Sequence, residues 1–413
     1  MRKEEFFRSA LPDSVGPLEG VQILEATHNF AGPNVGTVLA DLGADSVKCD
    51  PPEMGDILRH LPPFVDPEQS METGAQHLSI NRNKRDITLN FRHAKGQEIF
   101  RQLAKDVDIV VENFKPGTMK KWGLSYEDIQ KVKPDIIYVS VSGFGQFGPY
   151  HTRPSYDAVG QAMGGLMYVT GQPDGPPTRP GFGLGDSLAV WQGALAALAA
   201  LHYRNRTGKG QHVDISQVDT ILYLSESGIL LSSQLNQSWE RIGSGHPLGA
   251  PYNAYPCKDD HVFIGIVVDA HWKKFCQVAG REELIDDPHT RTTTDRAGHR
   301  ELVDEAVSDW VHDKTVAEVV STLAEAELVV APIYSFPQII QDEHIREREM
   351  IAEVEHPKAG KIDVYGVASK FSLTPAKVRS AAPMMGEHNQ DIYSDRLGLS
   401  VGEMEQLRKE GII

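Results

Sequence analysis

Apolar and polar positions in the first 50 residues follow two different periods. Residues 21–26 are a short, mostly apolar run typical of a strand, and apolar residues at 35, 38, 39 and 42 mark one face of a helix. Gly43 is placed to end that helix, and residues 46–49 are the next strand-like run. A strand, a helix and a strand within about 30 residues predict a βαβ crossover.

The same alternation continues along the chain. A helical pattern around 95–105 precedes the apolar run 107–111, and a short helix at 125–132 precedes the run 136–141. Residues 187–204 are rich in Ala and Leu and predict a long core helix. Strands that are apolar on both faces, with helices between them, indicate an α/β fold built on a Rossmann-like parallel sheet.

The pattern changes after about residue 225. A stretch containing Gly, Pro and Ser at 243–256 precedes a strand at 262–267, and amphipathic helices follow to about 330. We therefore expect residues 1–224 to form the first part of a large domain and 225–330 a smaller α+β domain. Residues 331–413 are predicted to be a linker and a return to the large domain.

Composition and charge exclude several classes of function. Lys and Arg number 41 against 57 Asp and Glu, a net charge of −16, which argues against binding to nucleic acid. No signal-peptide pattern and no window of ~20 apolar residues is recognisable, so we expect a cytoplasmic protein that is not bound to a membrane. The three cysteines have no metal-ligand spacing, and no metal is expected.

Three segments are candidates for ligand binding. The first βα turn, residues 27–33, lacks GxGxxG, and GxxxxGK[ST] is also missing, so neither NAD nor ATP is supported. Four cations between 82 and 92 are a candidate phosphate site, although a solvated loop and strand edge has equal weight. Asn113 and Phe114 follow the strand at 107–111, where parallel sheets bind ligands, but a plain loop is equally compatible.

Asp186 has the most informative surroundings. Three glycines at 181, 183 and 185 precede it, and glycines allow a bulky ligand to approach the backbone. The residue is placed to open the helix at 187–204, either as a simple N-cap or as an ionised nucleophile for a thioester carbonyl. The two interpretations are compatible.

Ordered motifs along almost the whole chain resemble the class III CoA-transferases, which include formyl-CoA transferase and carnitine CoA-transferase, with α-methylacyl-CoA racemase as a relative. The matching segments are PLEGVQILEATHNFAGP, LADLGADSVK, NRNKRDITLN, VVENFKPGTMKKWGLSYEDI, SGFGQFGPY, PSYDAVGQAMGG, LGDS, RTGKGQHVDIS and GEHNQDIY. The resemblance implies a homodimer of interlocked subunits that moves CoA from an acyl-CoA to a free carboxylic acid, with CoA thioesters as substrates and no permanently bound cofactor.

The resemblance also implies roles for individual residues. Asp186 corresponds to the family's nucleophile, which passes through an aspartyl anhydride and an aspartyl-CoA thioester. Asp157 corresponds to a position near the acyl group, and a mobile glycine run over the site corresponds here to Gly243, Gly245 and His246. The implied CoA contacts are Leu89, Arg92, Asn113, Phe114, Lys121 and Tyr156.

Two alternatives stay open at the level of sequence. One is racemase-type isomerisation, which the resemblance makes less favourable because Tyr156 stands where the racemase has a histidine. The other is a catalytically silent subunit of a heteromer, against which the intact LGDS motif argues. Phe30 and Pro51 replace a glutamine and an arginine of formyl-CoA transferase, which favours an acid larger or less polar than oxalate. The donor and the acceptor are not identified.

Overall fold

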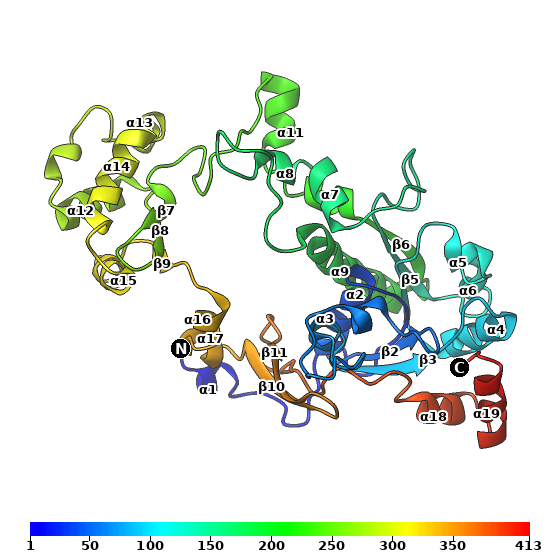
Figure 1. The fold of residues 1–413 in the computed structure, drawn as a ribbon. Helices are drawn as coiled ribbons and strands as arrows, with labels where there is room; N and C mark the ends of the chain where they lie inside the picture. The colour runs from blue at the N-terminus through cyan, green and yellow to red at the C-terminus, as the bar shows by residue number, and fades with distance from the viewer. The chain divides into compact units, whose positions relative to one another are not determined.

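A computed structural model describes all 413 residues and divides them into two compact units. The first unit contains residues 1–164, 181–224 and 342–413, and the second contains residues 165–180 and 225–341. Both units are mixed α/β structures (Figure 1). The α/β class expected from the sequence is confirmed.

The first unit is built on a six-stranded sheet in which every neighbouring pair is parallel. The order β3-β2-β1-β4-β5-β6 is that of a Rossmann sheet. β1 therefore lies between β2 and β4: the chain runs outward from β1 through β2 to β3, then returns to the other side of β1 and continues outward through β4, β5 and β6. The strands are β1 (Gln22–Ala26), β2 (Asp45–Asp50), β3 (Lys84–Thr88), β4 (Ile109–Glu112), β5 (Ile137–Ser142) and β6 (Gln211–Ser216).

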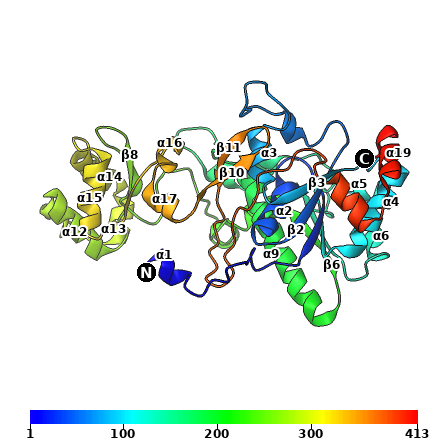
Figure 2. The same ribbon diagram turned by 90° about the horizontal axis from the view of Figure 1, so that it is seen from below.

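Helices cover both faces of this sheet, as the apolar runs of the strands require (Figure 2). On one face α2 (Ala31–Asp41) and α9 (Leu184–Thr207) bury Val35, Leu39 and Ala194 against Ile23, Ile109 and Val139. The opposite face carries α4 (Ala94–Leu103), α5 (Thr118–Lys121), α6 (Tyr126–Gln130) and the C-terminal α19 (Val401–Lys409).

The long helix α9 corrects two sequence-based expectations. It begins at Leu184 with Gly183 as its N-cap, so Asp186 is the third residue of the helix and not its cap. By length and composition it is also apolar enough to cross a membrane, which corrects the expectation that no such window exists. Its small residues Gly193, Ala194 and Ala197 are buried in the core of the first unit, so one face of the helix packs in that core, whereas Trp191 and Leu195 are exposed.

The C-terminal segment packs on the β3 edge of the large sheet. The Thr88 N–H donates to Asn389 Oδ1 at 2.9 Å, and the Tyr393 hydroxyl donates to the Thr88 carbonyl at 2.6 Å. The other elements of this unit are α1 (Lys3–Phe6), η1 (Ile57–His60), α3 (Ala75–Ile80), η2 (Ala104–Asp106), α7 (Asp157–Met163), α10 (Gln217–Leu222), α17 (Glu343–Glu347), β10 (Ile351–His356), β11 (Gly360–Tyr365), α18 (Asn389–Asp391) and η5 (Ile392–Arg396).

The second unit has its own core around a three-stranded antiparallel sheet of β7 (Tyr252–Pro256), β8 (His261–Gly265) and β9 (Val330–Pro332). Trp272, Phe275 and Val307 are fully buried in that core. Its helices are α8 (Leu166–Val169), α11 (Gly228–Leu230), η3 (Leu231–Leu235), α12 (Asp269–Ala279), η4 (Glu282–Leu284), α13 (Thr293–Gly298), α14 (Arg300–Val311), α15 (Val316–Glu325) and α16 (Phe336–Ile339).

Candidate active site

A cavity of about 390 Å³ opens at the carboxyl ends of β1, β4 and β5 in the first unit. This is the point of the sheet where the strand order reverses, the usual ligand position in open parallel sheets. The lining residues come from six stretches of the chain: 28–31, 113–118 without Gly117, 141–143, His151 with 153–156, Asp186 and Gln217.

Asn113 joins two of these segments. Its Nδ2 donates to the His28 carbonyl at 2.8 Å, and its Oδ1 accepts the His28 N–H at 2.9 Å. Gly32 permits this arrangement, because a Cβ there would lie 2.5 Å from Asn113 Cγ. The loop after β4 and the turn after β1 are thereby held together at the cavity.

Phe114 is fixed through both its backbone and its ring. Its N–H donates to the carboxyl of the buried Glu112 at 2.9 Å, and its ring packs edge-on against Trp122 with centroids 5.0 Å apart. Burial raises the pKa of Glu112 to about 7, despite hydrogen bonds from Ser140 and the Phe114 N–H that lower it. The cavity wall therefore rests on a carboxyl group that titrates near neutral pH.

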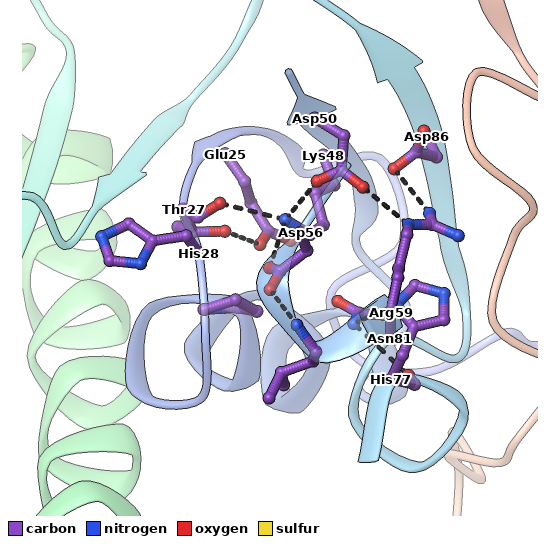
Figure 3. A network of polar contacts seen from close by, with 12 residues as sticks. Glu25, Thr27, His28, Lys48, Asp50, Asp56, Arg59, His77, Asn81 and Asp86 are labelled. Carbon is purple, nitrogen blue, oxygen red and sulfur yellow. Dashed lines mark hydrogen bonds and ion pairs between the residues drawn. The ribbon is translucent and has the colours of Figure 1, made fainter. Parts of the chain in front are cut away.

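A buried network of charges supports the turn after β1 from below (Figure 3). The Lys48 ammonium donates to the Thr27 carbonyl at 3.0 Å and pairs with Asp50 at 2.6 Å and Asp56 at 3.0 Å. Asp56 accepts the N–H of Asn29 at 3.0 Å, a residue whose φ of 60° is in the left-handed region. The turn is thus held in a conformation that most side chains disfavour.

The same network extends toward β3. Arg59 pairs with Asp50 at 2.9 Å and with Asp86 at 3.3 Å, and all three side chains are fully buried. Burial alone would lower the pKa of Lys48. The carboxylates of Asp50 and Asp56 outweigh this effect and raise that pKa above its ordinary value. Lys48 is therefore a permanent buried cation. The His28 ring, in contrast, is directed away from this network (Figure 3).

Asp186 lies in the cavity wall in the first turn of α9 and is half-buried. The Gln217 amide donates a hydrogen bond to its Oδ1. The capping role expected of Asp186 belongs to Asp157, whose Oδ1 accepts the N–H of Gly185 at 2.8 Å and of Asp186 at 3.3 Å. Gln161 in turn donates to both Asp157 oxygens, at 2.9 and 2.8 Å. Asp157 thus positions the backbone that carries Asp186, and its expected contact with an acyl group stays a prediction.

The other residues assigned from the resemblance are only partly brought together. Asn113, Phe114 and Tyr156 line the cavity, whereas the exposed Arg92 and Lys121 do not. The Leu89 side chain is fully buried in the core, so only its backbone could touch a ligand.

Gly243, Gly245 and His246 belong to the second unit. There the Gly243 N–H donates to the Gly171 carbonyl at 2.8 Å, and the His246 ring lies against Tyr252 with centroids 5.3 Å apart. Their expected role at the site stays a prediction.

Most of the cations between residues 82 and 92 are engaged in ion pairs and do not form the expected phosphate site. Arg82 and Lys84 are buried and paired with Asp41 and Glu25 respectively, and Arg85 pairs with Asp45. These three cations are paired with carboxylates within the first unit, and Arg92 is the one member of the group that is exposed and unpaired.

Sequence reasoning missed Gln217, Ser155 and Arg153, all of which line the cavity. Ser155 and Arg153 are next to or within the motif PSYDAVGQAMGG, and Gln217 directly follows HVDIS. Their proximity to those motifs was the available signal, but nothing local indicated which side chains face the cavity.

Comparisons with known proteins indicate one family for this chain. A model of CoA-transferase family III matches residues 18–389. The chain is 36% identical over 406 residues to succinyl-CoA–D-citramalate CoA-transferase of Chloroflexus aurantiacus, covering 96% of this chain and 98% of the relative. It is also 36% identical to succinyl-CoA:mesaconate CoA-transferase of Haloarcula hispanica, covering 94% and 98%.

A solved structure agrees at the level of the fold. A CAIB/BAIF family protein from Brucella suis superposes with a TM-score of 0.83 and 32% identity, covering 92% of this chain and 99% of that one. Matches that span nearly the full length of both partners, in sequence and in structure, identify the chain as a member of CoA-transferase family III.

Proposed function

We propose that this protein transfers CoA from a dicarboxylic acyl-CoA to a free dicarboxylic acid, with Asp186 as the nucleophile. The observation that carries the proposal is the Asp186 carboxylate, which lies in the first turn of α9, accepts a hydrogen bond from the Gln217 amide and lines the cavity at the sheet's reversal point. A helix N-terminus and an amide donor both favour an ionised carboxylate, the form that attacks carbonyl carbon.

In the first half-reaction an Asp186 oxygen attacks the acyl-CoA carbonyl. The C–S bond breaks, CoA leaves as a thiolate, and a mixed anhydride forms. The thiolate then attacks Cγ of Asp186, which breaks the anhydride, releases the donor acid as a carboxylate and forms an aspartyl-CoA thioester. The acceptor carboxylate attacks that thioester, which breaks the C–S bond, expels CoA thiolate and forms a second anhydride. The thiolate then attacks the acyl carbonyl of this anhydride, which breaks the bond to the Asp186 oxygen, forms the new acyl-CoA and returns Asp186 as a carboxylate. Each bond broken expels a good leaving group, so no step requires a proton.

The proposed substrate class rests on the relatives and on charge. The two related enzymes named above act on succinyl-CoA and, as acceptors, on citramalate or mesaconate, both of which are dicarboxylic acids. In this acidic protein, His151, Lys115 and Arg153 all line the cavity, and the Arg153 guanidinium lies 3.8 Å from the Tyr150 ring centroid without an ion pair. An unpaired arginine is suited to the second carboxylate of such substrates.

We extend the proposal to the CoA contacts, the assembly and the cellular compartment that the resemblance implies. Arg92 and Lys121 would hold CoA phosphates, Tyr156 would line the CoA channel, and the assembly would be a cytoplasmic homodimer. These roles are extensions of the central proposal and do not carry it.

A substrate panel tests this function. The enzyme is incubated with succinyl-CoA and equimolar mixtures of dicarboxylic and monocarboxylic acids, and new thioesters are identified by mass spectrometry. We expect a dicarboxylic CoA ester to form as free succinate is released in equal amount. Free CoA without a new thioester would contradict the proposal, as would deuterium uptake at the α-carbon of a 2-methylacyl-CoA in D₂O without any acceptor.

A further inference from the structure

Gln217 is the first residue of α10, directly after β6, and its side chain is buried between two other residues of the cavity wall. Its Nε2 donates to Asp186 Oδ1, and its Oε1 accepts the Ser155 hydroxyl at 3.1 Å. Ser155, Gln217 and Asp186 thus form a short hydrogen-bonded chain that ends on the proposed nucleophile.

The direction of this chain follows from donors and acceptors. An ionised carboxylate only accepts, so the amide nitrogen and not the amide oxygen must face Asp186. The amide oxygen is then left for Ser155, whose hydroxyl can donate. A flipped amide would place two oxygens in contact at Asp186, so this contact selects the orientation, and the Ser155 hydroxyl, which can donate, is compatible with it.

Close packing holds the amide in this place. A Cβ at Gly160 would lie 2.9 Å from the Gln217 Cβ, and a Cβ at Gly143 would lie 2.1 Å from the Ser155 Cβ. These two glycines let the two side chains approach, and the packing leaves Gln217 little freedom to turn away. Gln217 is therefore a preorganised donor, which costs little reorganisation when charge develops on its acceptor.

We propose that Gln217 is a catalytic residue whose amide stabilises the oxyanions that form at Cγ of Asp186, an inference that rests on the function proposed above. When one Asp186 oxygen has become the bridging atom of the anhydride, Oδ1 is the carbonyl oxygen of Cγ. Thiolate attack on Cγ forms the C–S bond and moves the π electrons onto Oδ1. Their return breaks the bond to the bridging oxygen and expels the donor acid as a carboxylate.

The same atom carries the charge in the second half-reaction. The acceptor carboxylate attacks Cγ of the aspartyl thioester, the electrons again move to Oδ1, and their return breaks the C–S bond and expels thiolate. Gln217 thus serves two tetrahedral intermediates. Attack of Asp186 on the substrate carbonyl places its oxyanion on a different oxygen. Removal of the amide should therefore slow the steps at Cγ more than the formation of the anhydride.

Gln217→Met, which preserves length and removes the donor, tests the proposal. We expect kcat to fall by about 10²–10³-fold, the usual loss for one oxyanion donor, with KM for acyl-CoA changed by less than about threefold. The acid limb of the kcat/KM profile should move to higher pH, because an ionised carboxylate loses a donor. In quenched single turnovers, release of thiolate should persist while the aspartyl-CoA thioester forms slowly.

Gln22→Met is the matched control. Gln22 is half-buried and accepts a hydrogen bond from Arg396 at 2.6 Å, but it lies at the opposite end of the sheet, so the variant should retain wild-type kcat. If Gln217→Met does not fold, Ser155→Ala gives the second test, because loss of the orienting hydroxyl should lower kcat by about tenfold.

Several outcomes would overturn the proposal. A folded Gln217→Met enzyme with kcat within threefold of wild type would do so, and so would one that forms the aspartyl thioester at the wild-type rate. In the second test, a Ser155→Ala enzyme with wild-type kcat would likewise overturn the proposal. A wild-type enzyme without any transfer would instead contradict the proposed function itself, so the two failures are distinguishable.

Discussion

At the scale of single residues, Glu112 supports the cavity wall through a hydrogen bond to Phe114, although Glu112 does not itself line the cavity. Its carboxyl accepts the Phe114 N–H at 2.9 Å, and the Ser140 hydroxyl beside it lies 2.9 Å from His212 Nε2. Burial raises the pKa of Glu112 to about 7 and lowers the pKa of His212, so both groups favour their neutral forms in the folded chain. The Phe114 N–H is therefore bound by a carboxyl group that is costly to ionise, and the nearby His212 is also costly to ionise.

Glu112→Gln should change how stability depends on pH. Because the pKa of Glu112 is about 7 in the folded chain and about 4.5 ordinarily, the folded state holds an extra proton between these values. Stability from this group is complete below about pH 4.5 and is lost as the pH rises through 7. Between pH 6 and 8 wild type should lose roughly 1 kcal/mol more unfolding free energy than the non-titrating variant, measured by urea denaturation. An equal pH dependence in both proteins would contradict this assignment.

At the scale of elements, the turn between β1 and α2 shows how the fold supports the site. Lys48 and Asp56 form hydrogen bonds with its backbone, and so does Asn113 at the end of the neighbouring strand β4. Both supports come from chain segments that are distant in sequence and that meet because β2, β1 and β4 are adjacent. Damage to the network should therefore affect both stability and the cavity.

Lys48→Met tests the energetic part of this account. The variant leaves Asp50 and Asp56 buried without their shared cation, so the free energy of unfolding should fall by about 3–5 kcal/mol. Lys361→Met is the control, because its pair with Glu353 is exposed on the β10–β11 hairpin and its loss should leave stability unchanged within error. Equal losses in the two variants, measured by urea denaturation, would show that burial of the Lys48 pairs adds nothing.

At the scale of the whole molecule, the elements that sequence could predict are those whose signal is local. β4 and β5 are mostly apolar runs, and helical periodicity lies between the strands, so sequence places β1, α2, β2, β4 and β5 within a few residues. The polar sequences KRDIT of β3 and QHVDIS of β6 carry no such signal. The start of α9 was misplaced because its cap is not local: the carboxylate comes from Asp157, 28 residues before Gly185.

The same reason explains which parts of the site could not be predicted. Arg82 and Lys84 resemble a phosphate site in sequence, but their partners Asp41 and Glu25 lie 41 and 59 residues away. The contact between Gln217 and Asp186 spans 31 residues and depends on the order of the strands. Asn113 and Phe114 could be placed, because the end of a buried parallel strand is itself a local signal.

The most direct test of the account is chemical trapping of Asp186 during turnover. Hydroxylamine is added to enzyme with acyl-CoA, and peptides are mapped by mass spectrometry, with Asp186→Asn and enzyme without acyl-CoA as controls. We expect a hydroxamate on Asp186 only in wild type with acyl-CoA, and transfer in Asp186→Asn at least about a thousandfold slower. Transfer near the wild-type rate in Asp186→Asn, or hydroxamate formed on another residue during turnover, would contradict it.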